Sequence, residues 1–183
     1  MAMVIGVLVV VVLAWTIWIF NRLVRLRNQV RTAWADIDVQ RTRRHDLVPQ
    51  LVAAVKGYAD YEAATLEAVT ALRNQAVGIS GPARLGEVEA SLTLALGRLF
   101  ALQEAYPDLK ASENFQQLHR DLVQVEDHLQ YARRFYNGAV RDYNDAGQRF
   151  PDLFVARGFG FGHAEFFQAD DAARPAVAVE LSR

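Results

Sequence analysis

The chain opens with a long apolar run. Residues 1–21 contain no Asp, Glu, Lys or Arg, and Met3–Phe20 is almost wholly aliphatic or aromatic. At about 1.5 Å per helical residue, Met3–Phe20 spans roughly 27 Å, close to the hydrocarbon thickness of a bilayer. Trp15 and Trp18 lie in its last turns, where indole rings favour the boundary between water and lipid. The pattern predicts a transmembrane anchor over residues 1–21.

Two other interpretations of this run fit less well. A cleaved signal peptide begins with basic residues and ends on small ones, whereas here no basic residue precedes the run and Trp15–Phe20 is bulky. A core helix of a soluble protein normally has one polar face, whereas this run is apolar on every side. The pattern therefore favours an uncleaved anchor.

Apolar side chains at three- and four-residue spacing continue after the anchor, which is the pattern of amphipathic helices. Pro49 disfavours α geometry at Val48, so we expect a turn or kink near residues 45–48, and the sequence leaves open which of the two it is. Residues that interrupt helices, in 77–82 and at Pro107, separate the amphipathic segments that follow. The predicted helices cover about 22–45, 48–76, 83–106 and 110–146.

The fold expected from these stripes is all-α, because no alternating apolar and polar run persists beyond a few residues. Long helices with short connections pack most economically antiparallel. We predict a single N-terminal transmembrane helix followed by an antiparallel four-helix bundle over residues 22–147, with coiled-coil-like packing. The irregular tail, 148–183, is predicted to be packed to about residue 167 and disordered beyond it.

The charge is unevenly placed. Residues 22–44 hold seven Arg against two Asp, and residues 45–183 hold thirteen Lys or Arg against nineteen Asp or Glu. General nucleic-acid binding requires a basic domain, so this acidic one argues against it. The chain has no cysteine, which excludes disulfides, thiolate catalysis and Cys-ligated metal.

Four arginines directly follow the anchor and none precedes it: Arg22, Arg25, Arg27 and Arg31. The positive-inside rule then places the domain in the cytoplasm and the short N-terminus outside, as a single-pass protein of the cell membrane. These arginines are candidates for binding anionic lipid headgroups, at about 1 kcal/mol for each basic residue near the surface.

A second basic cluster consists of Arg41, Arg43 and Arg44. On a straight helix Arg41 lies about twenty residues, or ~30 Å, beyond the membrane edge. That distance exceeds the Debye length of about 8 Å at physiological salt, so headgroup binding is not expected here. Two alternatives stay open for this cluster: ion pairs with neighbouring helices, or an acidic partner surface.

Residues suited to catalysis or metal binding form no recognisable set. A di-iron bundle needs Glu-x-x-His on two helices, and Glu126 and His128 are only two residues apart, so they do not share a helix face. Gly158–Gly162 lacks the Gly-Lys-Ser/Thr ending of a phosphate loop; its alternating Gly and Phe can instead lay two rings into a groove of the bundle. We predict no catalytic residue, metal or cofactor.

Three stretches together resemble the LemA family of membrane-anchored helical proteins. They are LVRLRNQVRTAWADIDVQRTRRHDLVPQLVAAVKGY at Leu23–Tyr58, EAYPDLKASENFQQLHRDLVQVEDHLQYARRFYNGAVRDYN at Glu104–Asn144, and Phe150-Pro151 with the Gly-Phe tail. The resemblance implies a four-helix bundle behind one membrane helix, no established enzymatic activity, and membrane-bound metalloproteases as possible partners. Arg41-Thr42 replaces the usual Leu-Lys, and Val125 a usual Thr.

Five polar or aromatic residues of the family motifs are expected to be structural: Trp34, Asp36, Asp38, Asn137 and Asn144. Asp36 and Asp38 are two residues apart and so point to different faces, which argues against an acid–base pair. Asn137 and Asn144 are one heptad apart, and buried Asn can fix the register of packed helices.

The function expected is that of a non-enzymatic scaffold or interaction module at the cytoplasmic face, with membrane lipid and a membrane protein as partners. The alternative is a homo-oligomeric structural protein of the envelope. A bundle metalloenzyme using His119, Glu126 or His128 is the weakest of the three hypotheses.

Overall fold

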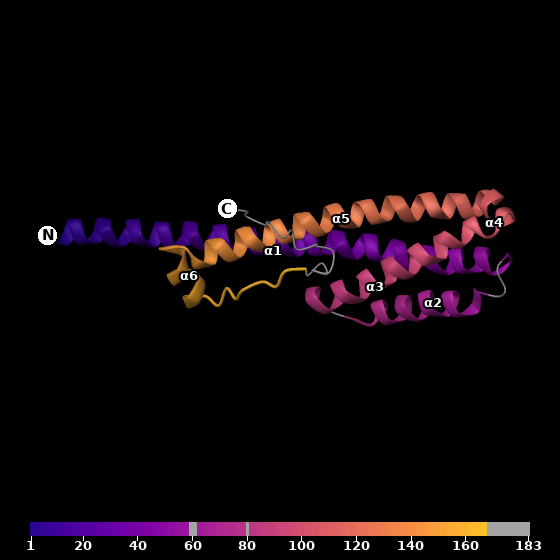
Figure 1. The fold of residues 1–183 in the computed structure, drawn as a ribbon. Helices are drawn as coiled ribbons and strands as arrows, with labels where there is room; N and C mark the ends of the chain where they lie inside the picture. Colours follow the sequence, from indigo (N-terminus) through magenta and orange to yellow (C-terminus); the bar gives the residue numbers. More distant parts are fainter. Residues whose placement is uncertain (59–61, 80, 168–183) are drawn as a thin grey trace, which may run out of the picture. The chain divides into compact units, whose positions relative to one another are not determined.

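The computed structural model describes residues 1–58, 62–79 and 81–167, and this part of the chain is helical without a strand. The predicted all-α class is therefore confirmed, whereas the antiparallel four-helix bundle stays a prediction. The elements (Figure 1) are α1 (Ala2–Lys56), α2 (Ala63–Val77), α3 (Pro82–Ala101), the 3₁₀ helix η2 (Leu102–Glu104), α4 (Pro107–Ala111), α5 (Glu113–Gln148) and α6 (Asp152–Gly158).

The chain divides into two compact units. The first unit contains Met1–Arg44 and Leu122–Phe166, and the second contains His45–Asp121 together with Phe167. Each unit is thus built from segments that are distant in sequence.

In the first unit, α5 lies alongside α1 and runs in the opposite direction (Figure 1). The rings of Trp34 and Tyr136 are 5.4 Å apart, and Arg44 Nη2 lies 3.2 Å from Glu126 Oε2, so residue numbers rise along one helix as they fall along the other. Apolar side chains on the facing stripes account for this pairing, because burying each one stabilises the fold by roughly 1.5–3 kcal/mol. Those buried on α5 include Val125, Leu129, Tyr136, Ala139, Val140 and Tyr143.

In the second unit, α2 and α3 pack against each other. Gly81 joins them at φ 107°, a backbone conformation that only glycine adopts readily. Ser112 caps the start of α5, where the Phe115 N–H donates to its Oγ at 3.4 Å. The buried side chains of this unit include Leu51, Val55, Leu85, Leu92, Leu99 and Phe115.

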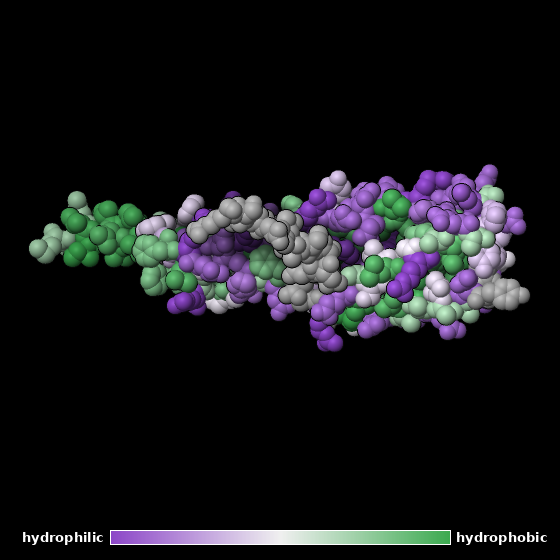
Figure 2. All heavy atoms as spheres, viewed as in Figure 1, coloured by the Kyte–Doolittle hydropathy of each residue, from purple (hydrophilic) through white to green (hydrophobic). Residues whose placement is uncertain are grey.

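The N-terminal part of α1 is exposed and apolar. α1 contains a stretch long and apolar enough to cross a membrane, and that stretch is almost entirely exposed. Figure 2 shows it as the hydrophobic, green end of the molecule. The exposed stretch of α1 ends at Trp18, since Trp18 is 60% exposed and Ile19 only 3%. The last residues of the predicted anchor therefore belong to the folded first unit.

The chain does not turn near residues 45–48, because α1 continues through Pro49 to Lys56; a kink at this position stays a prediction. Proline has no N–H, so the carbonyl of His45, four residues earlier, lacks its helical donor. Arg73 on α2 replaces that donor, since its Nε donates to the His45 carbonyl at 3.2 Å. A tertiary hydrogen bond thus satisfies the group that the proline leaves open.

Other predicted boundaries also need correction. The predicted helix 48–76 is divided between the end of α1 and α2, while the expected loop after Val77 is present. The predicted irregular tail contains α6. Phe167 is buried, and packing of the tail up to about residue 167 stays a prediction. The disorder expected beyond that position lies outside the described residues.

Substituting Arg73 tests how α1 tolerates its proline. We expect Arg73→Met to lower the free energy of local opening around Leu51–Val55 by about 1–3 kcal/mol, because the His45 carbonyl loses its donor. The loss should shrink in the Pro49→Ala background, where a backbone N–H is restored. Hydrogen exchange of the α1 amides measures both values, with exposed Arg84→Met as the control. Equal losses with and without proline would contradict this explanation.

Candidate functional site

The first unit surrounds the end of the apolar run with α6 and the segment that follows it. Ile19 and Leu23 of α1 form a buried cluster with Ala146 of α5 and with Val155 and Ala156 of α6. The anchor therefore leads directly into a packed protein core.

Aromatic rings extend this cluster. The Phe20 ring lies edge-on to Phe159 at 5.1 Å and to Phe161 at 5.5 Å between ring centroids, an arrangement favoured by aromatic quadrupoles. Phe161 is half-buried, with the Arg27 guanidinium 5.0 Å above its ring. Phe159 stays 60% exposed. The expectation that the Gly-Phe tail lays two rings into a groove therefore fits Phe161 better than Phe159.

An ion pair fixes α6 to α1. Arg22 Nη1 donates to Asp152 Oδ2 at 2.6 Å, and the side chains are 40% and 7% exposed respectively. A buried carboxylate is costly unless it is paired, and a charge-assisted hydrogen bond offsets that cost. Arg22, predicted as a lipid-binding residue, thus has a protein partner 130 positions away in the sequence.

The segment after α6 lies against α5, held by side chains of that helix. Asn144 binds Ala164 twice, since its Nδ2 donates to the Ala164 carbonyl and its Oδ1 accepts from the Ala164 N–H, both at 2.9 Å. Tyr143 donates its hydroxyl to the Gly162 carbonyl at 2.9 Å, and Tyr136 donates to the Glu165 carbonyl at 2.8 Å. Asn144 therefore fixes the register of this tail segment, not that of a neighbouring helix.

Glycine shapes the turn between α6 and the tail segment. Gly160 has φ 71°, and the Phe161 N–H donates to the Ala156 carbonyl at 2.9 Å. A hydrogen bond that spans five residues behind a left-handed glycine is the usual end of a helix. It directs the chain back along α5, toward the three side chains that bind it.

Burial affects the two tyrosines of this arrangement. It raises the pKa of Tyr136 above its ordinary value of 10.0, and the Glu165 carboxylate raises it further. It also raises the pKa of Tyr143, against the opposing effect of Arg27 and Arg31. Both hydroxyls therefore stay protonated, and able to donate, over the whole physiological pH range.

The remaining membrane-proximal arginines differ in their surroundings. Arg25 and Arg31 are exposed, whereas Arg27 is half-buried over Phe161. Lipid binding by the four arginines stays a prediction.

The residues of the second basic cluster, Arg41, Arg43 and Arg44, also differ in their surroundings. Arg44 is buried and pairs with Glu126, whose other oxygen lies 3.7 Å from Arg133 Nη1. Arg41 is buried and pairs with Asp38 at 3.2 Å, and Arg43 is exposed. An interhelical ion pair, one of the two alternatives for this cluster, is thus present at Arg44.

The other motif residues occupy different environments. Trp34 is half-buried against Tyr136, Asp36 and Asp38 are exposed, and Asn137 is half-buried on α5. The heptad repeat thus brings Tyr136, Tyr143 and Asn144 together at the tail, which sequence reasoning did not anticipate. The repeated Tyr-Asn pairs were the available signal, but their partners are backbone atoms that no side-chain pattern encodes.

No cluster of three or more His, Asp or Glu side chains suited to a metal lies within residues 1–58, 62–79 and 81–167. His119 stacks on Phe100 at 4.1 Å between ring centroids. In the second unit, His45 Nε2 lies 3.1 Å from Glu89 Oε1, and both side chains are buried. Sequence reasoning missed this pair, although Glu89 lies four residues after Leu85 on the apolar stripe of α3, where a carboxylate is unexpected.

Among the hollows of the described surface, one in each unit lies beside the features described above. In the first unit, a cavity of about 220 Å³ lies beside the tail segment, between Tyr143, Leu153 and His163. In the second unit, an open groove of about 450 Å³ runs between the end of α1 and α2, lined by Val52, Leu66 and neighbours. Neither brings together a nucleophile, a base and an oxyanion donor, which a hydrolytic site would need.

Comparison with known proteins matches this chain to one family profile and to several named relatives. A sequence profile described as the LemA family matches residues 33–181. Protein LemA of Metamycoplasma hominis is 28% identical over 158 residues, which cover 84% of this chain and 71% of that protein. Magnetosome protein MamQ 2 of Paramagnetospirillum magneticum is 27% identical over 197 residues, covering 93% and 72% respectively. Magnetosome protein MamQ of Magnetospirillum gryphiswaldense is 32% identical over 95 residues, covering 52% and 35%.

Asn144→Ala should release the tail segment. It removes two hydrogen bonds and leaves the Ala164 N–H without its acceptor, so we expect attachment to weaken by about 1–3 kcal/mol. Faster exchange of the Ala164 amide and faster proteolysis near residue 164 would reveal the release. Exposed Asp142→Ala, two positions away, is the control and should leave both rates unchanged. Unchanged exchange in Asn144→Ala would contradict this role for the amide.

Alkaline pH should also release the tail segment, because it deprotonates Tyr136 and Tyr143. Since the folded pKa values of Tyr136 and Tyr143 are raised above 10.0, their contribution is complete below pH 10 and is lost as the pH rises through the folded values. Exchange of the tail amides, corrected for its intrinsic pH dependence, should therefore accelerate above pH 10. The double variant Tyr136→Phe and Tyr143→Phe should lack this acceleration; its persistence would assign the effect to other groups.

Proposed function

This chain belongs to the LemA family, and we propose that it is a membrane-anchored protein that acts by binding other proteins and carries out no reaction of its own. The exposed apolar part of α1 is the observation that carries the proposal. A solvent-exposed helix that is apolar on every side is stable only when lipid or protein covers it. Anchorage in a bilayer supplies that cover.

The proposed orientation places the N-terminus outside and the folded units in the cytoplasm. Its support is the pair of arginines, Arg22 and Arg25, that directly follow the apolar run. Arg25 is exposed just beyond the apolar stretch, where it can face anionic headgroups.

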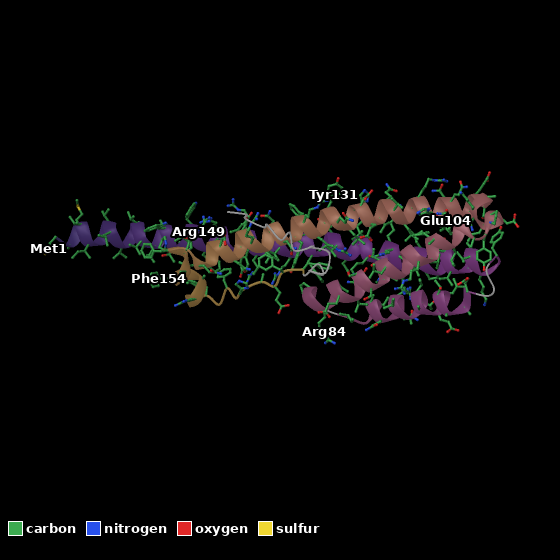
Figure 3. The ribbon with its side chains drawn as sticks, viewed as in Figure 1. Met1, Arg84, Glu104, Tyr131, Arg149 and Phe154 are labelled. Carbon is green, nitrogen blue, oxygen red and sulfur yellow. The ribbon has the colours of Figure 1, made fainter. Side chains whose placement is uncertain are left out.

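A surface of α5 supports the binding role. Tyr131 and Phe135 are 66% and 51% exposed, and their spacing of four places both rings on one face of the helix. Figure 3 shows Tyr131 projecting away from α5. The Arg134 guanidinium lies 4.9 Å over the Tyr131 ring. Aromatic and arginine side chains contribute disproportionately to protein interfaces, so we propose that this surface meets a membrane protein.

The nature of the partner follows from resemblance only. Members of the family suggest a membrane-bound metalloprotease, and the relatives' names, LemA and magnetosome protein MamQ, state no reaction. The second candidate function is a homo-oligomeric structural protein, in which the Tyr131 surfaces of two copies would meet.

Crosslinked co-purification of the full-length chain tests the proposal. We expect a membrane-permeant crosslinker to capture one reproducible membrane protein from intact cells, and an impermeant one to capture none, because the folded units face the cytoplasm. The variant Tyr131→Ser and Phe135→Ser should reduce capture roughly tenfold, as expected for a loss of about 1.4 kcal/mol. Gln124→Ser with His128→Ser, at the same spacing on exposed α5 positions, is the matched control.

A variant without residues 2–16 separates anchorage from folding, because it keeps Ile19 and Phe20 in the packed core. It should lose the captured partner. Capture of this chain alone would favour the homo-oligomer, and capture of no reproducible protein would contradict both candidates. Capture by the impermeant reagent would reverse the proposed orientation.

A further inference from the structure

We propose that α6 and the residues that flank it form a second membrane contact, in which Phe150, Phe154 and Phe159 enter the boundary between headgroups and acyl chains beside α1. This inference rests on the proposed membrane anchorage and adds a lipid-binding site to it. The ligand is the bilayer that α1 crosses.

Exposed phenylalanine rings are the first observation. Phe150, Phe154 and Phe159 are 80%, 67% and 60% exposed, and the Phe150 and Phe154 rings meet edge-on at 6.0 Å between centroids. The opposite face of α6 is buried through Asp152, Val155 and Ala156. α6 therefore presents apolar residues on both faces, one to the protein core and one to the surroundings. An exposed aromatic group of this kind marks a binding surface.

The level of α6 along α1 is the second observation. A hydrocarbon core of about 30 Å takes roughly 20 helical residues. The uncharged residues 1–21 supply that length, so the cytoplasmic boundary of the core falls near Phe20 and Arg22. Phe20 contacts Phe159, and Arg22 binds Asp152. These two contacts place α6 at the boundary itself.

The charges around α6 suit this position. Arg149 precedes Phe150, Arg157 follows Phe154, and both arginines are exposed; Figure 3 labels Arg149 and Phe154 in the same region of the first unit, inward of Met1. Arg149 lies 3.7 Å from the Asp145 carboxylate, in a pair that is exposed to solvent. The one acidic residue of α6, Asp152, is buried and neutralised by Arg22. Apolar side chains next to arginines are the composition of segments that lie in the membrane interface.

The rigid attachment of α6 to α1 means that a lipid contact at α6 would also restrain α1. A single helix can tilt and rotate in a bilayer, and interfacial aromatic and basic anchors restrict both motions. The core cluster around Ile19 and the Arg22–Asp152 pair prevent α6 from moving independently of α1. The contact would therefore set the height and rotation of α1, and with them those of the first unit.

Single-cysteine labelling can test this contact, because the natural chain has no cysteine. The full-length variants Phe154→Cys and Phe150→Cys, each labelled with a nitrobenzoxadiazole fluorophore, are reconstituted into phosphatidylcholine–phosphatidylglycerol vesicles. We expect doxyl-labelled lipid to quench both labels several-fold more than aqueous iodide does. Tyr131→Cys, on an equally exposed aromatic of the same unit, is the matched control and should show the reverse order.

Val10→Cys, in the middle of the apolar run, distinguishes the two proposals. If lipid quenches the label at position 10 while iodide quenches those at 150 and 154, the anchor is real and the second contact is wrong. Iodide quenching at position 10 would overturn the anchorage and this inference together. Because the Phe150 and Phe154 side chains are 80% and 67% exposed, their substitution should leave the far-ultraviolet circular dichroism unchanged. A label at 154 that lipid quenches no more than one at 131 would also contradict the second contact.

Discussion

The Arg22–Asp152 ion pair is the contact on which the first unit depends. It joins the residue that ends the uncharged run to a buried carboxylate at the start of α6. Removing Arg22 would leave the Asp152 carboxylate, 7% exposed, without its counter-charge in a poorly solvated place, which is more costly than losing an exposed salt bridge. Around it, Ile19, Phe20 and Leu23 are packed by α5, α6 and the tail segment. The apolar helix and the folded unit therefore share side chains, and no flexible linker separates them.

The tail segment is held by a different kind of interaction. Tyr136, Tyr143 and Asn144 bind the backbone of Gly162–Glu165, so its attachment requires three side chains on one face of α5 and no regular secondary structure. Such bonds are worth about 1 kcal/mol each, and more when a buried partner would otherwise be unsatisfied. They keep α6 and Phe161 against α1. The segment that follows α6 is thus held in place by polar groups of α5.

Sequence reasoning succeeded with the class of fold and failed with the details that depend on distant residues. The loop after Val77 follows from local chemistry and is present. The chain does not turn at Pro49, where Arg73 supplies the donor that the proline lacks. Asn144 was expected between helices, but it binds the tail. In each failure, one group's partner lies at least 20 positions away in the sequence, beyond the reach of any helical periodicity.

The sequence by itself determined the apolar run, the helical class and the resemblance to the LemA family, because hydrophobic periodicity and motif spacing are properties of neighbouring residues. Only the tertiary structure decided which charges are buried and paired, where α1 ends, and that Ile19 is buried in the protein core with Phe20 packed against it. Those outcomes depend on which side chains α2, α5 and α6 bring against α1. The free energy of a buried charge or an unpaired carbonyl is set by that tertiary environment, and the linear pattern does not contain it.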